Sequence, residues 1–480
     1  MTSRPASIPA DDSLLEQLGT CVDPSRVSGD LTTRMAYARD AYPPALKAAG
    51  DGVSPYLPAA VVWPESTAEV RDIVLAATKL NVSIVPYGGG SGIVGGALAC
   101  PGAVIVDLKR LSRIINIDSV SLTATVEAGI LGKVLEDELN AHGLTCGHFP
   151  QSINSSTLGG WIAHRGVGTF STKYGKIDDL VLSLEVVLPD GQVLWTRTVP
   201  QSAAGPDLRR LFLGAEGTIG IITSATIQVF PLPEARLHRS FVATSFVDAL
   251  ESVRHIVQRG LRPAVIRVYD AVETQAQFSS LGVAPGSTVV LLVAEGDRAL
   301  TEFTIEQASS QMLGSGCVDL GTSVGEYWFG HRLSTASLCR TLSKAGGVAD
   351  ALEVANVWSR LPATYERMKT AMESAVGEHG SVYGHSSHFY HSGANLYMIF
   401  HALATDPAET SVLYQRVLAA AFDACFAEGG TLTHHHGVGL GKQRWLGEEW
   451  GDAGTHVWRV IRQGLDPARV MNPGKMGDGA

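Results

Sequence analysis

The sequence lacks the features that mark several classes of protein. No apolar run approaches the ~18 residues that a membrane-spanning helix needs. No long run of Lys or Arg is present and the formal net charge is −10, so nucleic acid is not an expected partner. The six cysteines lie far apart, without a CxxC or zinc-type spacing, which fits reduced thiols rather than a disulfide framework. These absences leave a small molecule as the expected partner.

The ends of the chain also lack a recognisable address. The first residues, MTSRPASIPADDSLL, contain no apolar core of a secretory signal, and the final GDGA is not a targeting tripeptide. We therefore expect a cytoplasmic protein, with peripheral membrane contact left open.

What the sequence does contain is enough apolar material for two domains. A chain of 480 residues exceeds one ordinary core, and 45% of the residues are hydrophobic. Residues 1–235 alternate β-rich runs and helical periods with glycine-rich loops, and Ser66 with Glu69 predicts a capping box at a helix start. Residues 236–430 repeat the order strand, helix, strand, with a last strand expected at GGTLTHHH. The pattern predicts an α+β fold in which residues 431–480 return to the first domain.

Three glycine-rich segments lie in the first half of the chain. PYGGGSGIVGG has six glycines among eleven residues, so its backbone amides can approach an anion closely. It has no P-loop lysine and does not open a helix as a dinucleotide-binding loop does. The plainer alternative to an anion-binding loop is a surface turn. PQSINSSTLGGWIAHRGVGTFSTKYGKIDDLV and LGAEGTIGIIT follow. Three such segments in one domain indicate a long ligand that is held along its length.

Together with the terminal MNPGK, these segments resemble the FAD-binding domain of the vanillyl-alcohol oxidase/p-cresol methylhydroxylase superfamily, from about Pro58 to Lys475. The resemblance implies a two-domain flavoprotein with a split FAD-binding domain and an α/β cap that binds the substrate. The residues it assigns to FAD are Pro86, Tyr87, Gly88, Gly89, Gly90, Ser91, Gly92, Pro150, Ser155, Ser156, Thr157, Gly159, Gly160, Ala163, Arg165, Gly168, Glu216, Gly217, Gly220 and Ile221. Because the loop from Tyr87 to Ser91 offers neither His nor Cys, we expect non-covalent FAD.

Two subgroups of the superfamily have cap motifs that can be compared with those of this sequence. VIRVYD, GHSSHFYHSGANLYMIF and THHHGVGLGKQRWL resemble the alkyldihydroxyacetonephosphate synthases. The 2-hydroxy acid dehydrogenases carry GHxGDGNxH and EHGxG instead, and several members bind a divalent metal there. Here His435 replaces the glutamate, which removes a hard ligand, and we expect no metal. A zinc site formed by His385, His388 and His391 would need a helix that the flanking glycines disfavour.

The synthase resemblance implies an exchange without net electron transfer. Flavin N5 would hold the dihydroxyacetone phosphate skeleton while a fatty alcohol replaces the acyl chain. The implied catalytic residues are Tyr390, His434, His435, His436, Arg267 and Arg340. Tyr390 would assist proton transfer and Arg267 would hold phosphate, whereas the alignment of Arg340 is loose and Arg332 is its rival. Consecutive residues on an extended chain face opposite sides, so at most two of the three imidazoles should reach the flavin.

Each assignment has a plainer alternative. Arg267 could pair with Asp270 on a solvated strand, Tyr390 could fill the edge of a core, and Glu216 could cap a surface helix. An FAD-dependent oxidase or dehydrogenase of a 2-hydroxy acid or alcohol is the alternative function, and a flavin-bearing binding protein is the third. In each case we expect a homodimer, and for the enzymes a small-molecule or lipid substrate.

Overall fold

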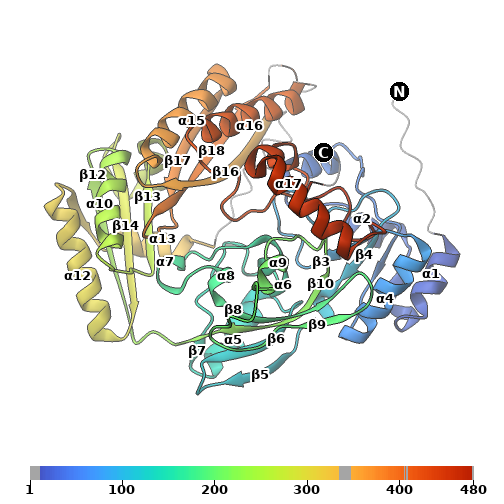
Figure 1. Cartoon of the computed structure of the whole chain (residues 1–480). Coiled ribbons are helices and arrows are strands. Elements are labelled where there is room, and N and C mark those ends of the chain that lie inside the picture. Colours follow the sequence, from blue (N-terminus) through green and yellow to red (C-terminus); the bar gives the residue numbers. More distant parts are fainter. Residues whose placement is uncertain (1–10, 334–346, 405, 407–408, 478–480) are drawn as a thin grey trace.

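The computed structural model describes residues 11–333, 347–404, 406 and 409–477. Within these ranges the strands form sheets of four, five, two and seven strands. The seven-stranded sheet and its helices occupy one side of the molecule, and the sheets of four and five strands occupy the other (Figure 1). The predicted α+β class is confirmed. No helix in the described ranges has both the length and the apolar character needed to cross a bilayer.

The four-stranded sheet has the order β1-β2-β4-β3, and β2, β3 and β4 run parallel. Its strands are β1 (Val27–Ser28), β2 (Ala60–Val62), β3 (Ile84–Tyr87) and β4 (Val104–Asp107). Helix α4 (Thr67–Leu80) begins where predicted, because the Ser66 side chain accepts from the backbone N–H of Glu69. Only one of the two hydrogen bonds of the predicted capping box is present. The Glu69 carboxylate accepts from Arg26 and from the Glu65 backbone rather than returning to Ser66.

The five-stranded sheet is antiparallel and has the order β5-β6-β10-β8-β9. Its strands are β5 (Ile114–Asp118), β6 (Thr123–Glu127), β8 (Val181–Val187), β9 (Val193–Trp195) and β10 (Ile221–Gln228), and β7 (Leu144–Thr145) pairs with β11 (Phe230–Pro231). The other helices of this half are α1 (Asp12–Gly19), α2 (Leu31–Ala36), α3 (Pro43–Gly50), α5 (Gly132–Ala141), α6 (Leu158–His164), α7 (Ser171–Tyr174), α8 (Ile177–Leu180) and α9 (Arg209–Phe212).

The seven-stranded sheet has the order β15-β12-β14-β13-β17-β18-β16. Its strands are β12 (Ala235–Ala243), β13 (Val265–Tyr269), β14 (Thr288–Gly296), β15 (Val318–Gly321), β16 (Gly347–Val357), β17 (Gly380–Ser386) and β18 (Gly393–Leu403). The accompanying helices are α10 (Phe246–Gln258), α11 (Ala271–Phe278), α12 (Arg298–Gly314), α13 (Ser323–His331), α15 (Leu361–Val376) and α16 (Thr410–Ala427). The predicted order strand, helix, strand is found twice in this half, as β12, α10 and β13 and as β14, α12 and β15.

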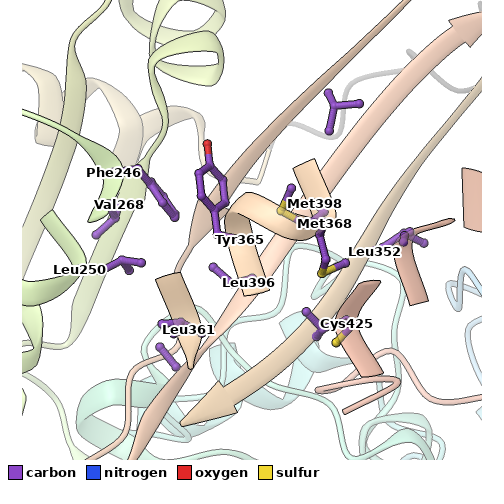
Figure 2. Packing of buried hydrophobic residues seen from close by; sticks show 14 of the residues in the cluster. Phe246, Leu250, Val268, Leu352, Leu361, Tyr365, Met368, Leu396, Met398 and Cys425 are labelled. Carbon is purple, nitrogen blue, oxygen red and sulfur yellow. The ribbon is translucent and has the colours of Figure 1, made fainter. Parts of the chain in front are cut away.

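The two faces of this sheet differ in polarity, because successive side chains of a strand point to opposite faces. Leu352 and Val354 of β16 enter a large apolar core beneath α10, α12, α15 and α16, and Leu396 and Met398 of β18 join them (Figure 2). Glu353 lies between Leu352 and Val354, and Tyr397 lies between Leu396 and Met398, so both point to the opposite face of the sheet. These two residues are direct partners in the pairing of β16 with β18. The polar face of the cap is therefore built from residues interleaved with its core.

The segment after the cap contacts the first sheets. After α17 (Leu446–Leu465), Met471 bridges to Ile84 at β3. The Asn472 amide donates to the carbonyl oxygen of Gly96 at 3.0 Å and to that of Glu216 at 2.7 Å. The strand expected at GGTLTHHH is wrong, because Thr431 makes only an isolated bridge and the three histidines lie in a loop. The domain boundaries near residues 235 and 430 stay a prediction.

Candidate active site at the histidine loop

Residues 433–439 form a loop, called here the histidine loop, whose backbone is held by a carboxylate from the cap. Glu353 of β16 accepts from the backbone N–H of His435 at 3.0 Å and from that of His436. The hydroxyl of Thr433 donates to the same oxygen, and the N–H of His434 donates to the Glu353 carbonyl oxygen at 3.3 Å. Glu353, through its carboxylate and its backbone carbonyl, thus fixes the backbone of all three histidines.

Glu353 is fully buried and carries a charge that its neighbours compensate. Its second oxygen accepts from the ammonium of Lys442, which is itself 3% exposed, and lies 3.4 Å from His436 Nδ1. Burial alone would raise the pKa of Glu353, but His436 and Lys442 hold that pKa well below its ordinary value. Reasoning from the sequence missed Glu353, because this residue lies about eighty positions from the histidine loop. The one local signal is that this acid stands between the apolar residues Leu352 and Val354.

A second carboxylate holds the other end of the histidine loop. Glu216 accepts from the N–H of Val438 at 2.6 Å and from that of Gly439 at 2.9 Å. A side chain at Gly437, whose φ is +80°, would place its Cβ 2.5 Å from the Glu216 carboxylate, so glycine is needed there. Glu216 is 4% exposed, so the alternative of a surface helix cap is wrong. Its predicted contact with FAD stays a prediction.

Between these supports, four side chains form a continuous hydrogen-bonded row. The Tyr390 hydroxyl lies 2.8 Å from His434 Nε2, and His434 Nδ1 lies 2.9 Å from His435 Nδ1. His435 Nε2 lies 2.6 Å from the hydroxyl of Tyr397 on β18. We call these four residues the tyrosine–histidine row. It contains two of the three predicted imidazoles, whereas His436 turns to Glu353.

The members of the row are neutral near pH 7. Burial lowers the pKa of His434 to about 3, although Glu353 opposes the shift, and burial also lowers the pKa of His435 well below its ordinary value. Burial raises the pKa of Tyr390 and of Tyr397, with Asp179 and Glu353 adding to the respective effects. Tyr390 is part-buried and its hydroxyl belongs to the row, so it does more than fill the edge of a core.

His388 extends the site toward the first domain. Its Nδ1 lies 2.8 Å from the hydroxyl of Ser171 on α7, and its ring stacks on that of His434 with centroids 5.4 Å apart. The Asn395 side chain accepts from the backbone N–H of His388 at 2.8 Å. His385 lies on β17 and His391 on an exposed turn, so the three histidines of the zinc alternative do not converge. Across the described residues, no group of three or more His, Cys, Asp or Glu is arranged to hold a metal.

Arg267 is 8% exposed and lies on β13, so the alternative of a solvated strand is wrong. Its guanidinium Nη2 lies 2.8 Å from His385 Nε2, and its Nε has no hydrogen-bond partner among the described residues. Asp270 is occupied elsewhere, because it caps α11 by accepting from the Glu273 N–H at 2.9 Å. Arg340 lies outside the described residues. Its rival Arg332 covers the ring of Phe329, 3.8 Å from the centroid.

The three glycine-rich segments meet at the carboxyl end of β3. A Cβ on Gly89 would lie 1.6 Å from the carbonyl oxygen of Ser155, and one on Gly217 would lie 2.8 Å from Pro86 Cγ. The backbone N–H groups of Gly89, Gly90, Ser91 and Gly92 make no hydrogen bond within the described part of the chain. Half-buried, unused amides that converge on one loop fit the pyrophosphate of FAD.

Other residues assigned to FAD have protein partners that explain them. A Cβ on Gly159, Gly168 or Gly220 would meet Ala128, the Phe149 backbone or Val186 at 2.9 Å or less, and Ile221 is 1% exposed in β10. Arg165 donates to Asp178 at 2.7 Å. Thr157 caps α6, and Ser156 accepts from the Trp161 indole. The remaining assigned residues, namely Tyr87, Gly88, Pro150, Gly160 and Ala163, lie along the same segments.

Family models and known relatives match most of the chain. Residues 58–197 match the model of an FAD binding domain, and residues 232–476 match that of the C-terminal domain of FAD linked oxidases. An alkyldihydroxyacetonephosphate synthase from Caenorhabditis elegans is 31% identical, over 88% of this chain and 76% of that protein. The FAD-linked oxidoreductase YgcU of Escherichia coli K12 is 32% identical, over 87% of this chain and 88% of its own length. A crystal structure of an alkyldihydroxyacetonephosphate synthase matches with a TM-score of 0.81 and 26% identity, over 99% of this chain and 86% of that one.

Proposed function

Because this chain belongs to the FAD-dependent enzymes of the vanillyl-alcohol oxidase/p-cresol methylhydroxylase superfamily, we propose that it replaces the acyl chain of acyl-dihydroxyacetone phosphate with a fatty alcohol. The observation that carries the proposal is the tyrosine–histidine row, in which every member is a neutral proton donor and acceptor. When bound, FAD would supply an electrophilic ring that can hold the substrate carbon skeleton.

The row can pass a proton in either direction. The two Nδ1 atoms of His434 and His435 share one proton, so the Nε2 of the imidazole that holds it must accept from its tyrosine. The other imidazole then carries its proton on Nε2 and donates to the second tyrosine. Moving the shared proton to the other imidazole reverses the direction of every hydrogen bond in the row. An exchange needs this symmetry, because one step removes a proton and the other returns it to a leaving group.

The rest of the site supports an anionic substrate. Arg267 is buried, and its Nε is free to donate to an oxyanion beside the row. We also propose that FAD is held without a covalent bond, since residues 86–92 contain neither His nor Cys. Release of the yellow cofactor on denaturation of the purified protein would check this.

The exchange is tested with a labelled alcohol. Purified holoprotein is incubated without oxygen with acyl-dihydroxyacetone phosphate and a radiolabelled fatty alcohol. The proposal expects labelled ether product and an equal amount of released fatty acid. Absence of both products from folded, FAD-loaded protein would contradict it.

Oxidation of a 2-hydroxy acid or alcohol is the second candidate. The relative YgcU, named as an FAD-linked oxidoreductase, is as similar as the synthase, and Arg267 would hold a carboxylate as readily as a phosphate. The row does not favour this reaction, because a hydride transfer needs a proton to leave only once. Anaerobic bleaching of the flavin by glycolate or D-lactate would select this candidate.

A further inference from the structure

Arg267 ends a second buried series of polar contacts, separate from the tyrosine–histidine row. His385 on β17 lies between two partners, with its Nε2 2.8 Å from Arg267 Nη2 and its Nδ1 2.8 Å from the Glu273 carboxylate. The three side chains are 8%, 6% and 3% exposed for Arg267, His385 and Glu273 respectively. A carboxylate, an imidazole and a guanidinium thus stand in line inside the cap.

The protonation of this line follows from its chemistry. A guanidinium has only donors, so His385 Nε2 must be the acceptor and carry no proton. The single proton of the neutral ring therefore sits on Nδ1 and is donated to Glu273. Burial lowers the pKa of His385 although Glu273 opposes the shift, which keeps the ring neutral. The tautomer is fixed because a proton on Nε2 would face the guanidinium.

Surrounding contacts fix each member of the line. Asp270 accepts from the Glu273 N–H and from the Gly384 N–H at 2.8 Å, which ties the start of α11 to β17. The His385 ring stacks on that of Tyr397, with centroids 4.4 Å apart and an angle of 25°. The guanidinium therefore has a rigid support on one side, while its Nε is left without a partner.

We propose that Glu273 and His385 are positioning residues that aim the guanidinium of Arg267 at an oxyanion of the substrate. The oxyanion is the phosphate of the substrate in the proposed function, on which this assignment of the ligand rests. A carboxylate offers the same pair of acceptors to the guanidinium, and belongs to the oxidase alternative. The positioning role holds for either ligand.

The test measures anion binding, which does not require the exchange reaction. FAD-loaded protein is titrated by calorimetry with inorganic phosphate in one arm and with D-lactate in the other. Arg267→Met should abolish binding of whichever of the two anions the original protein binds. That loss would place the anion at Arg267. His385→Leu should weaken its binding on the order of 10- to 100-fold, because the guanidinium loses its direction.

Two further variants separate positioning from packing. His385→Gln can still accept from Arg267 and donate to Glu273, so it should bind the anion within about threefold of the original protein. Glu295→Gln is the matched control, because Glu295 is a buried acid of the same sheet that pairs with Arg236 and should leave binding unchanged. If His385→Leu does not fold, Glu273→Leu replaces it with the same expected loss.

The outcomes are distinct. Loss of phosphate binding in His385→Leu with recovery in His385→Gln supports the positioning role and a phosphate substrate. The same pattern for D-lactate alone supports the positioning role but contradicts the proposed function. Unchanged binding in His385→Leu, or equal losses in the Leu and Gln variants, would overturn the inference.

Discussion

The two ends of the histidine loop are held by carboxylates in different surroundings. Glu353 holds the end nearer the cap, forms an ion pair with Lys442, and is 0% exposed. Glu216 holds the end nearer the first domain by accepting backbone N–H groups, and is 4% exposed. Lys475, the buried cation near Glu216, donates to the Leu98 carbonyl oxygen and to Asn472 instead. The carboxylate at one end is therefore stabilised by an ion pair, and the carboxylate at the other end by backbone amide dipoles.

The difference assigns separate tasks to backbone and side chains. Because both carboxylates engage the loop through its backbone, the imidazoles of His434 and His435 remain available for the tyrosine–histidine row. Glu353 lies on β16 of the seven-stranded sheet, and Glu216 lies in the loop that leads into β10 of the five-stranded sheet. These sheets occupy opposite sides of the molecule, so the row lies between them (Figure 1). The row should therefore control the reaction, and the two ends should control stability to different degrees.

Removing a member of the row should have the largest effect. Tyr390→Phe deletes the terminal hydroxyl, so we expect exchange to fall by about 10²- to 10⁴-fold while FAD stays bound. The measurement is the rate of labelled alcohol incorporation. Tyr174→Phe is the control, because its hydroxyl donates to Glu295 at 2.7 Å, outside the row. An equal loss in both variants would show that the row has no special role.

Breaking the ion pair should have the next largest effect. Lys442→Met leaves the Glu353 carboxylate buried beside His436 alone, and should lower the free energy of unfolding by about 3–5 kcal/mol. Urea unfolding of the holoprotein measures this. The double variant Lys442→Met with Glu353→Gln removes both charges and should recover part of the loss. A double variant as unstable as the sum of the two single ones would contradict the pairing.

Weakening the other end should cost less. Glu216→Gln keeps an oxygen for one N–H group but removes the charge, so we expect a loss of about 1.5–3 kcal/mol, again by urea unfolding. Glu185→Gln, another buried acid of the first domain, is the comparison, because it accepts from the hydroxyls of Thr67 and Thr223. A loss larger than that of Lys442→Met would reverse the order of the two ends.

Within one pH unit below neutrality, the smallest effect comes from the protonation of His434. The pKa of His434 is about 3 in the folded protein, below its unfolded value of about 6.5. Its stabilising contribution is thus full above pH 6.5 and is lost as pH falls toward 3. His434→Gln should remove up to about 1.4 kcal/mol of this dependence per pH unit below 6.5. Unfolding at several pH values measures it. Parallel curves for the His434 variant and the original protein would refute the assignment.

The sequence predicted local features well and distant partners poorly. The glycine-rich loops and most strands follow from short motifs, because glycine and period-two patterns act within a few residues. The resemblance supplied Tyr390, His434 and His435, but neither Tyr397 nor Glu353, which reach the loop only through strand pairing. The alternative that paired Arg267 with Asp270 was wrong for the same reason, since Asp270 is near in sequence whereas His385 lies on β17. Nothing local encodes such pairings.

The central claim is that the site exchanges groups without a net transfer of electrons. Its most direct test follows the flavin absorbance of the holoprotein without oxygen. Addition of acyl-dihydroxyacetone phosphate and fatty alcohol should yield ether product while the oxidised spectrum returns in full after turnover. Lasting bleaching by D-lactate or glycolate, with formation of the matching keto acid, would contradict the account.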